Sequence, residues 1–535
     1  MPNHTFRYAP ALLCIGLLVA SASCRDLTEV PFTQVTDQNF KPTGADIGSL
    51  IAPAYTPLRG LWMGWYGNLD TQEESSDELI TPVRPNGWYD GGTYIRMHQH
   101  RWDANQGQPS SLWGNAFGGI NAANRVIYQI ESGILPIEGD AKVSIPAELK
   151  ALRAYDYSLL LDNFGNVPIV TDFTATELPS QSSRADVYAF VVKELTDAIP
   201  QLSDIAGTAV YGRMNKWAAL AILARVQLNA GVYTGTPHYD QVLALTQQII
   251  DGQKYRLEQS YRAPFARNND QSVENIWAVP YDAINATGSS FHMKTLKPEL
   301  RFVFNMQAQP WGGSASNPQF IDTYDAADKR LQDTWLRGPQ FDNAAHGYDF
   351  VKFVPSITKT DFNNGFPVWK YEIYAGETGS SDVDYPIVRY AEVLMMRAEA
   401  LLRTGQADAA AAIVTQVRQR DFPSDPSKAT VAGAQLTQGS VYNYGWDDTD
   451  GVVKTAAGGA PVTNGGADIQ YGRFLDELGW EFAVEGHRRS DLIRFGVFTS
   501  KKWFNHVPNG DYRALFAIPS GVIATNSKLT QNPGY

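Results

Sequence analysis

Paired carboxylates and closely spaced histidines are the residues of this chain that could do acid–base or metal chemistry. Glu73-Glu74 and Asp77-Glu78 could supply the two carboxyl groups that hydrolysis of a glycosidic bond requires. In a chain with 56 acidic residues, however, solvated charges on a loop are the favoured interpretation. His98 and His100 would share one face of a strand and could bind a metal ion. Because no third ligand is suitably spaced, a structural histidine pair is favoured.

The usual catalytic motifs are absent from the sequence. It has no G-x-S-x-G nucleophile elbow, no P-loop, no H-E-x-x-H and no Rossmann glycine run. The run 485–491 (EGHRRSD) places opposite charges around a glycine, which is more typical of a salt-bridged helix junction than of an active site. We therefore expect no catalytic residues, no cofactor and no metal site, and a protein that is not an enzyme.

Cys24 is the residue best placed for covalent modification. It follows an apolar run at 11–20, too short to span a bilayer, and the small residues Ser21-Ala22-Ser23. This order resembles a bacterial lipobox, in which the cysteine is acylated after cleavage, although Ser21 stands where leucine is usual. An ordinary signal peptide cleaved nearby is the alternative. The other cysteine, Cys14, lies in the removed segment, so the mature chain has no disulfide and depends on its core.

The charge balance argues against nucleic acid as a partner. The chain has 44 basic residues against 56 acidic ones and a net charge of −12, whereas contacts to phosphates need a basic face. Beyond residue 24, no apolar run approaches the length of a membrane span. We therefore expect attachment to a membrane only through the lipid.

Aromatic residues among glycines distinguish the segment 61–109. Rings that lie among turn residues do not fit the core stripe of a helix, so this segment is a candidate ligand surface. A pyranose has apolar faces and a hydroxyl rim, so Trp and Tyr can cover the faces while Asp, Asn and Arg bind the hydroxyls. The rings of this segment are Trp62, Trp65, Tyr66, Trp88, Tyr89, Tyr94 and Trp102.

Apolar residues at helical spacing predict a helical scaffold on both sides of a loop-rich middle. Ala218, Ala221 and Ala224 recur at every third position, which allows another helix to approach closely. The predicted helices cover residues 44–60, 110–133, 147–164, 184–202, 216–232, 390–403 and 407–420.

The last two of these helices resemble a tetratricopeptide repeat. Residues 398–410 have small side chains where two helices would touch, and Gly405 stands at the turn between them. We expect a mostly α fold in which several such helix pairs stack into a right-handed superhelix, with long loop-rich insertions that carry the ligand surface. A generic helical domain with fortuitous alanines is the alternative.

Short motifs along the whole chain resemble the SusD/RagB family of outer-membrane nutrient-binding lipoproteins. No single motif is specific, but together they run in order from the lipobox to the last residue. They are SDE at 76–78, GWYDGG at 87–92, HQH at 98–100, RAYDY at 153–157, FGNVP at 164–168, RMNKWAA at 213–219, YPIVRYAEVL at 385–394, EGHRR at 485–489 and QNPGY at 531–535.

The resemblance implies a non-catalytic binding protein at the outer membrane. It would cap a SusC-like TonB-dependent transporter and deliver an oligosaccharide or another nutrient to it. It also implies an arc of aromatic rings with polar side chains beside it, built from the loop after the first helix and from the loop-rich middle. By motif, the candidate ligand-binding residues are Trp88, Trp311, Asp77, Arg84, Tyr89 and, as a looser match, Tyr281.

The expected organisation is a signal peptide at 1–23, a lipidated tether at 24–43 and one SusD-like domain at 44–535. Two other functions stay open: an exported glycan-degrading enzyme, and a scaffold that binds only proteins through its repeats. The helical scaffold would lie mainly at 44–60, 110–252, 386–421 and 470–496, and the ligand-binding parts at about 61–109, 253–385 and 422–469.

Overall fold

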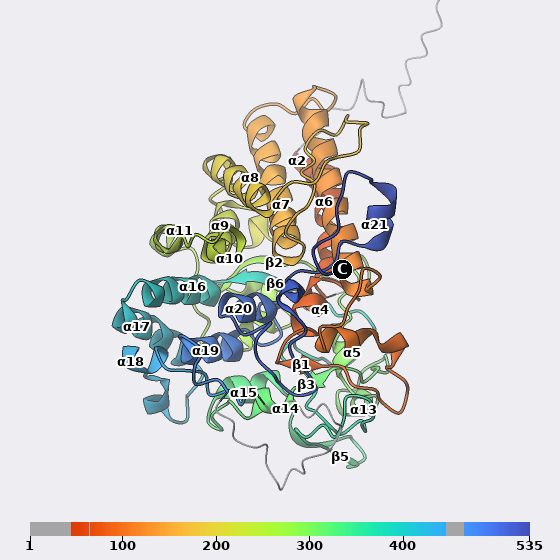
Figure 1. Cartoon of the computed structure of the whole chain (residues 1–535), viewed down its shortest axis with the longest axis vertical. Coiled ribbons are helices and arrows are strands. Elements are labelled where there is room, and N and C mark those ends of the chain that lie inside the picture. Colours follow the sequence, from red (N-terminus) through yellow and green to blue (C-terminus); the bar gives the residue numbers. More distant parts are fainter. Residues whose placement is uncertain (1–43, 64, 446–464) are drawn as a thin grey trace, which may run out of the picture.

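Helices that pack in succession along the chain form the scaffold of the molecule (Figure 1). The structure is a computed structural model that describes residues 44–63, 65–445 and 465–535, so Cys24 lies outside the described residues. The mostly α fold that the sequence predicts is confirmed. The scaffold helices are α2 (Gly44–Tyr55), α3 (Pro57–Leu61), α6 (Gly107–Glu131), α7 (Ala141–Asn163), α8 (Arg184–Ala198), α9 (Lys216–Leu228), α10 (Ala230–Thr234), α11 (Tyr239–Gly252), α16 (Tyr390–Arg403), α17 (Ala407–Arg418), α19 (Gly472–Phe482) and α20 (Arg488–Arg494).

Helix α9 illustrates how the sequence builds this scaffold. Asn215 caps the helix, because its side-chain oxygen accepts a hydrogen bond from the backbone N–H of Ala218 at 2.9 Å. Ala218, Ala221 and Ala224 are buried, and α9 packs against α11 and α8. The small side chains therefore allow the close helix approach that their spacing predicts.

The predicted helices appear with small shifts at their ends. The helix predicted at 147–164 begins earlier, at Ala141, and the one predicted at 407–420 ends at Arg418. Gly405 joins α16 to α17 with a φ of 83°, a left-handed conformation that glycine adopts without strain. The two helices pack against each other, which is consistent with the predicted repeat.

In the described part of the chain, three two-stranded antiparallel sheets tie segments together. β2 (Asn275–Val279) pairs with β6 (Tyr385–Arg389), so the two ends of the insertion at 280–384 lie side by side. β1 (Leu79–Ile80) pairs with β3 (Ala315–Ser316) and joins the first loop-rich segment to the second. The third sheet is the hairpin of β4 (Gly338–Phe341) and β5 (Gly347–Phe350).

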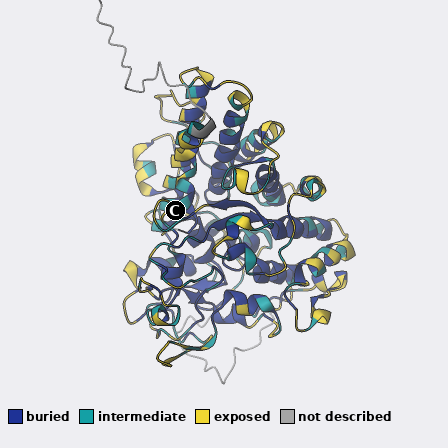
Figure 2. Ribbon diagram, turned by 180° about the vertical axis from the view of Figure 1, so that it is seen from behind, coloured by how far each residue is buried: buried dark blue, intermediate teal, exposed yellow. Residues whose placement is uncertain are grey.

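Short helices also cross the parts that the sequence predicts to be loop-rich. Figure 2 shows buried residues in these parts as well as between the long helices. No helix of the described residues combines the length and the apolar character that a membrane crossing needs. These short helices are α4 (Asn68–Glu73), α5 (Thr93–His98), α12 (Phe291–Thr295), α13 (Leu300–Val303), α14 (Pro318–Ile321), α15 (Lys329–Thr334) and α18 (Gly433–Leu436), and a further one, α21 (Ser520–Thr525), lies near the C-terminus.

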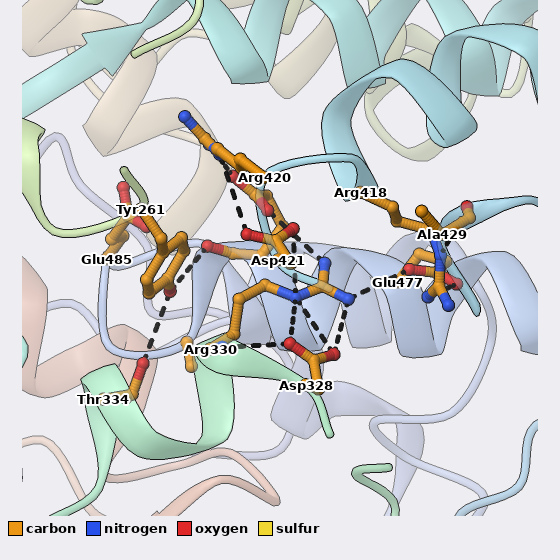
Figure 3. A network of polar contacts seen from close by, with 12 residues as sticks. Tyr261, Asp328, Arg330, Thr334, Arg418, Arg420, Asp421, Ala429, Glu477 and Glu485 are labelled. Carbon is orange, nitrogen blue, oxygen red and sulfur yellow. Dashed lines mark hydrogen bonds and ion pairs between the residues drawn. The ribbon is translucent and has the colours of Figure 1, made fainter. Parts of the chain in front are cut away.

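A buried network of ion pairs joins the helical scaffold to the insertion (Figure 3). Arg330 of α15 lies between Asp328, 2.7 Å away, and two glutamates of α19, Glu477 and Glu481. Arg418 of α17 donates a hydrogen bond to Glu477 at 2.6 Å. Side chains of α15, α17 and α19 therefore form one connected group of ion pairs.

Arg389, the last residue of β6, extends this network. Its guanidinium donates hydrogen bonds to Glu481 and Glu274 at 2.8 Å and to Glu485 at 2.7 Å. All four side chains are buried, so each charged group needs the opposite charges beside it to offset the free energy lost on leaving water. Although burial alone raises it, the pKa of Glu481 is lowered to about 2 by the surrounding guanidinium groups of Arg420, Arg389 and Arg330.

The carboxylates Glu73, Glu74, Asp77 and Glu78 are buried, so the interpretation as solvated loop charges is wrong. Burial raises the pKa of Glu73 to about 8, and its Oε1 accepts a hydrogen bond from the Gly486 N–H at 2.7 Å. These four groups are enclosed by the protein. Glu73, Asp77 and Glu78 contact the junction at 485–491, where the predicted salt-bridged structure is confirmed by the ion pairs of Glu485 and Arg488.

Three histidines pack together where the C-terminal segment meets the loop after α5. Each donates one ring N–H to a backbone carbonyl: His98 to Phe504 at 2.6 Å, His100 to Ser75 at 2.8 Å, and His506 to His98 at 3.1 Å. The rings of His100 and His506 are 4.1 Å apart. The structural interpretation of His98 and His100 is confirmed, although His98 ends a helix rather than lying on a strand. Among the described residues, no group of three or more potential ligands is arranged to hold a metal ion.

We expect Arg389→Leu to lower the free energy of unfolding by about 3–5 kcal/mol or to prevent folding, because three buried glutamates lose their shared cation. Urea denaturation followed by circular dichroism measures the change. Arg267→Leu is the control, since Arg267 pairs with Asp382 at the surface, and its loss should cost at most about 1 kcal/mol. Equal losses in the two variants would contradict the role of the network.

We expect His98→Gln to make the free energy of unfolding less dependent on pH between 7 and 4. Burial lowers the pKa of His98 from its ordinary 6.5 to about 4. The neutral ring therefore stabilises the fold above pH 6.5, and this contribution is lost as the pH falls toward 4. At about 1.4 kcal/mol per pKa unit, the wild-type chain should lose roughly 3 kcal/mol more than the variant.

Urea denaturation at several pH values measures this difference. If the profiles of His98→Gln and the wild-type chain run parallel, the buried ring is not a source of the pH dependence.

Candidate ligand-binding site

The pairing of β1 with β3 brings two distant aromatic loops together. In this antiparallel register, Ile80 lies opposite Ala315. Continued beyond the strand ends, the register places the residues that follow β1 beside those that precede β3. Trp88 and Trp311 therefore meet, and the indole N–H of Trp88 donates a hydrogen bond to the backbone carbonyl of Trp311 at 2.8 Å.

Trp65 completes a cluster of rings that we call the aromatic platform: Trp65, Trp88 and Trp311, supported by Tyr66 and Tyr94. The ring centroid of Trp65 is 5.7 Å from that of Trp88 and 5.3 Å from that of Trp311. Tyr94 contacts Trp65, Trp88 and Tyr66. Trp65 and Trp311 are 40% and 37% exposed, whereas Trp88 is only 8% exposed. The exposed face of the platform is thus made by Trp65 and Trp311, and Trp88 supports it from beneath.

Hydrogen bonds fix the two loops of the platform to each other. The Trp311 carbonyl also accepts a hydrogen bond from the side-chain amide of Asn86 at 2.7 Å. Arg84 Nε donates to the carbonyl of Gly313 at 3.2 Å. The backbone N–H groups of Trp311 and Gly313 donate to carbonyls of α12, both at 2.7 Å. The ring of Trp311 is therefore positioned by the loop after β1 and by α12 together.

The backbone beneath the platform adopts left-handed conformations. Trp88 has a φ of 59° and Tyr66 a φ of 63°, which cost on the order of 1 kcal/mol or more each for residues with a side chain. Gly313 leaves room for the indole of Trp88, since a Cβ at this position would lie 2.7 Å from the ring. The surrounding contacts must therefore offset the free energy of this strain. Backbone strain of this kind is common at sites where loops bind ligands.

The two tyrosines predicted to bind the ligand differ in exposure. Tyr89 follows Trp88 of the platform and is 59% exposed, with its ring beside Gly92. Tyr281 is buried, donates a hydrogen bond to the carbonyl of Arg59 at 2.8 Å and accepts one from the N–H of Met63 at 3.1 Å. The structure therefore gives Tyr281 a role in the core rather than in ligand contact.

Asp77 and Arg84 are buried, so their assignment as hydrogen-bonding partners of a ligand is corrected. Asp77 accepts hydrogen bonds from Arg488 at 2.7 and 2.9 Å and from the hydroxyl of Tyr444 at 2.5 Å. Burial lowers the pKa of Arg84 to about 9. Asp77 stabilises the junction at 485–491, whereas Arg84 stabilises the loops around the platform. Arg84 does so through the backbone carbonyls of Gly313, Asp361 and Asn364.

Trp65 is the platform residue that the sequence reasoning missed. It belongs to the aromatic segment at 61–109, but nothing in its own motif separates it from buried rings such as Trp62. The available signal is its position between Gly64 and Gly67, the glycine-flanked setting that also marks Trp88 and Trp311.

The two exposed indoles meet at an angle of 75° and form a corner. One ring can cover the apolar face of a pyranose while the other contacts its edge. Asn86 and Asp90 are exposed on the neighbouring loop and offer amide and carboxylate groups to hydroxyls. The arrangement suits a bent chain of sugars better than a flat one, which would need coplanar rings.

Two family models match most of the chain. The model of the SusD family matches residues 273–535, and a model described as starch-binding and associating with the outer membrane matches residues 38–228. The starch-binding protein SusD of Bacteroides thetaiotaomicron is 26% identical over 99% of this chain and 98% of its own length. The SusD-like protein P25 of Formosa agariphila is 21% identical over 98% of this chain and 99% of its own length.

Solved structures of similar proteins share the fold. The surface glycan-binding protein A of Bacteroides thetaiotaomicron, in complex with laminarihexaose, aligns with a TM-score of 0.69 at 19% identity, over 92% of this chain and 100% of its own. The surface glycan-binding protein A of Bacteroides uniformis aligns with a TM-score of 0.69 at 19% identity, over 92% of this chain and 99% of its own.

Proposed function

The chain belongs to the SusD family, and we propose that it is a cell-surface lipoprotein that binds a glycan and delivers it to a SusC-like TonB-dependent transporter. Two similar proteins have names that state a ligand, starch for SusD and laminarin for a SusD-like protein of solved structure, and both ligands are glucans. An oligosaccharide or polysaccharide is accordingly the ligand class that we assign to this chain.

The aromatic platform is the observation that carries this proposal. Exposed indoles are costly to leave in water, and Trp65 and Trp311 are held in position by buried neighbours rather than covered by them. Such rings bind the apolar faces of sugars, and the binding tolerates different sugars because every pyranose has such a face. Discrimination between glycans would come from exposed polar side chains at the rim of the platform. Asn86, Tyr89 and Asp90 are the ones nearest to Trp88 along the chain.

Delivery and anchoring form the second part of the proposal. A lipid on Cys24 would hold the protein at the outer membrane, with residues 24–43 as the tether between the lipid and the first scaffold helix. A binding protein held in this way cannot move its cargo across the membrane, so a transporter partner is required. A protein without catalytic activity is sufficient for this task.

We expect the double variant Trp65→Ala/Trp311→Ala to bind glycans at least roughly thirtyfold more weakly than the wild-type chain, since stacking contributes on the order of 1 kcal/mol per ring. Isothermal titration with maltoheptaose and laminarihexaose, as representatives of bent glucans, measures the affinity, and cellohexaose represents a flat chain. Product analysis of the same mixtures tests for hydrolysis, which would favour the glycan-degrading alternative.

The control for the platform variant is Tyr128→Ala/Phe173→Ala. These rings also form an exposed pair, with centroids 5.9 Å apart, but they lie at the far end of α6 and the loop after α7. We expect this variant to bind glycans normally. Equal weakening by both double variants, or unchanged binding without the platform rings, would argue against the site. If the wild-type chain binds no glycan of a broad panel, the protein-scaffold alternative gains support.

We expect Cys24 to carry a diacylglyceryl-type modification and the lipidated protein to co-purify with a TonB-dependent transporter after extraction in mild detergent. Mass spectrometry of the extracted protein measures both the modification and the partner. The variant Cys24→Ala should leave the membrane fraction. A mature chain that begins elsewhere, or a protein that purifies alone under several mild conditions, would remove the support for anchoring or for the partner, respectively.

A further inference from the structure

A buried lysine lies directly beneath the aromatic platform. The ammonium of Lys294, in α12, is 2.6 Å from Asp70 and 2.7 Å from Glu74, and all three side chains are buried. It also lies 4.7 Å from the centre of the ring of Tyr94, which supports Trp65 and Trp88. The group of Lys294, Asp70 and Glu74 is called here the buried triad.

The buried triad links the two halves of the platform. On one side, Asp70 Oδ2 accepts a hydrogen bond from the backbone N–H of Tyr66 at 3.3 Å, next to Trp65. On the other side, the carbonyl of Lys294 accepts hydrogen bonds from the N–H groups of Gly313 at 2.7 Å and Ser314 at 3.1 Å. A continuous path therefore runs from the loop of Trp65 through the triad to the loop of Trp311.

Glu74 strengthens this link on the β1 side. Its Oε1 accepts hydrogen bonds from the hydroxyls of Thr81 at 2.6 Å and Ser314 at 3.2 Å. Thr81 follows β1 and Ser314 precedes β3, so the triad also holds the sheet that brings the two loops together. Although burial alone lowers it, the pKa of Lys294 is raised above its ordinary value by Asp70 and Glu74, so the lysine remains charged.

We propose that Lys294, with Asp70 and Glu74, is the positioning residue of the ligand site: it sets the distance and angle between Trp65 and Trp311. This inference rests on the proposed function only for its consequence in binding. Without the triad, the rings would remain on the surface, but the corner between them would lose its defined shape. Binding would then fall toward that of the variant that lacks both rings.

Fluorine NMR of protein labelled with 5-fluorotryptophan tests the proposal without any ligand. The resonances of Trp65, Trp88 and Trp311 are assigned from single Trp→Phe variants. In Lys294→Met, we expect these three resonances to shift or broaden, while those of Trp217, Trp277 and Trp480, which lie in other parts of the core, stay in place. Titration with laminarihexaose and maltoheptaose then measures the loss of affinity.

Asp70→Asn is the second variant, in case Lys294→Met does not fold. It keeps the pair of Lys294 with Glu74, but the amide oxygen cannot serve both Lys294 and the Tyr66 N–H as the two carboxylate oxygens do. The same three resonances should move. If they do not move in Asp70→Asn, or in a folded Lys294→Met, the proposal is overturned.

Lys370→Met is the matched control. Lys370 is also buried, pairs with Glu485 and lies 4.8 Å from the centre of a tyrosine ring, that of Tyr261, but it belongs to the network of Arg389. Its loss should reduce stability without moving the platform resonances. Platform resonances that move as much in Lys370→Met would show a general response and contradict the proposal. Shifts in Lys294→Met without glycan binding by the wild-type chain would leave positioning intact and remove the proposed function.

Discussion

The need to pair buried charges is the constraint on which the rest of this structure depends. An ionised group that leaves water without a partner costs several kcal/mol, so the elements that supply the partners cannot move apart. Glu481 of α19 is shared by Arg389 of β6, by Arg420 and by Arg330 of α15. Strand β6, helix α15 and helix α19 are therefore held in one arrangement by a single carboxylate. The scaffold and the insertion meet at this point (Figure 3), so the network fixes where the insertion lies on the scaffold.

The aromatic platform, to which we assign glycan binding, repeats this principle on a smaller scale. Trp65 and Trp311 are exposed, yet each is held by groups that are not: the ring of Trp88, the ring of Tyr94 and hydrogen bonds to backbone carbonyls. An aromatic side chain has only two rotatable bonds, so once its backbone is fixed the ring loses little further freedom when a ligand binds. Polar residues near the site act mostly from the interior, and this leaves recognition at the surface to the rings and to the few polar groups at the rim.

The parts of the fold that the sequence predicts are those set by local spacing. Apolar periodicity places α9, α16 and α17 within a few residues of their observed bounds, because a helix is defined by its own residues. Trp88 and Trp311 are found as candidates because their glycine-flanked motifs match those of the family, and such motifs can be recognised in the sequence alone. Asp77 and Arg84 are candidates through the same resemblance and are nevertheless buried, because their partners come from distant parts of the chain. Arg488, the partner of Asp77, is 411 residues away, a distance over which spacing carries no information. The same holds for the corner formed by Trp65 and Trp311, which exists only after β1 and β3 have paired.

The antiparallel ladder of β2 and β6 has a consequence for how new specificities can arise. Val279 and Tyr385 are paired, so the roughly hundred residues between them leave the scaffold and return to it at the same place. When the ends of a flexible loop are paired in this way, a change of its length alters the free energy of folding only slightly, by about 0.6 kcal/mol for a doubling of length. A chain of this architecture can therefore exchange its recognition loops while its helices remain intact, provided that the new insertion still supplies a short strand to meet β1 and the cations that Arg330 and Lys370 contribute to the buried network. The exposed loops of the insertion can thus change while its buried anchoring residues are retained.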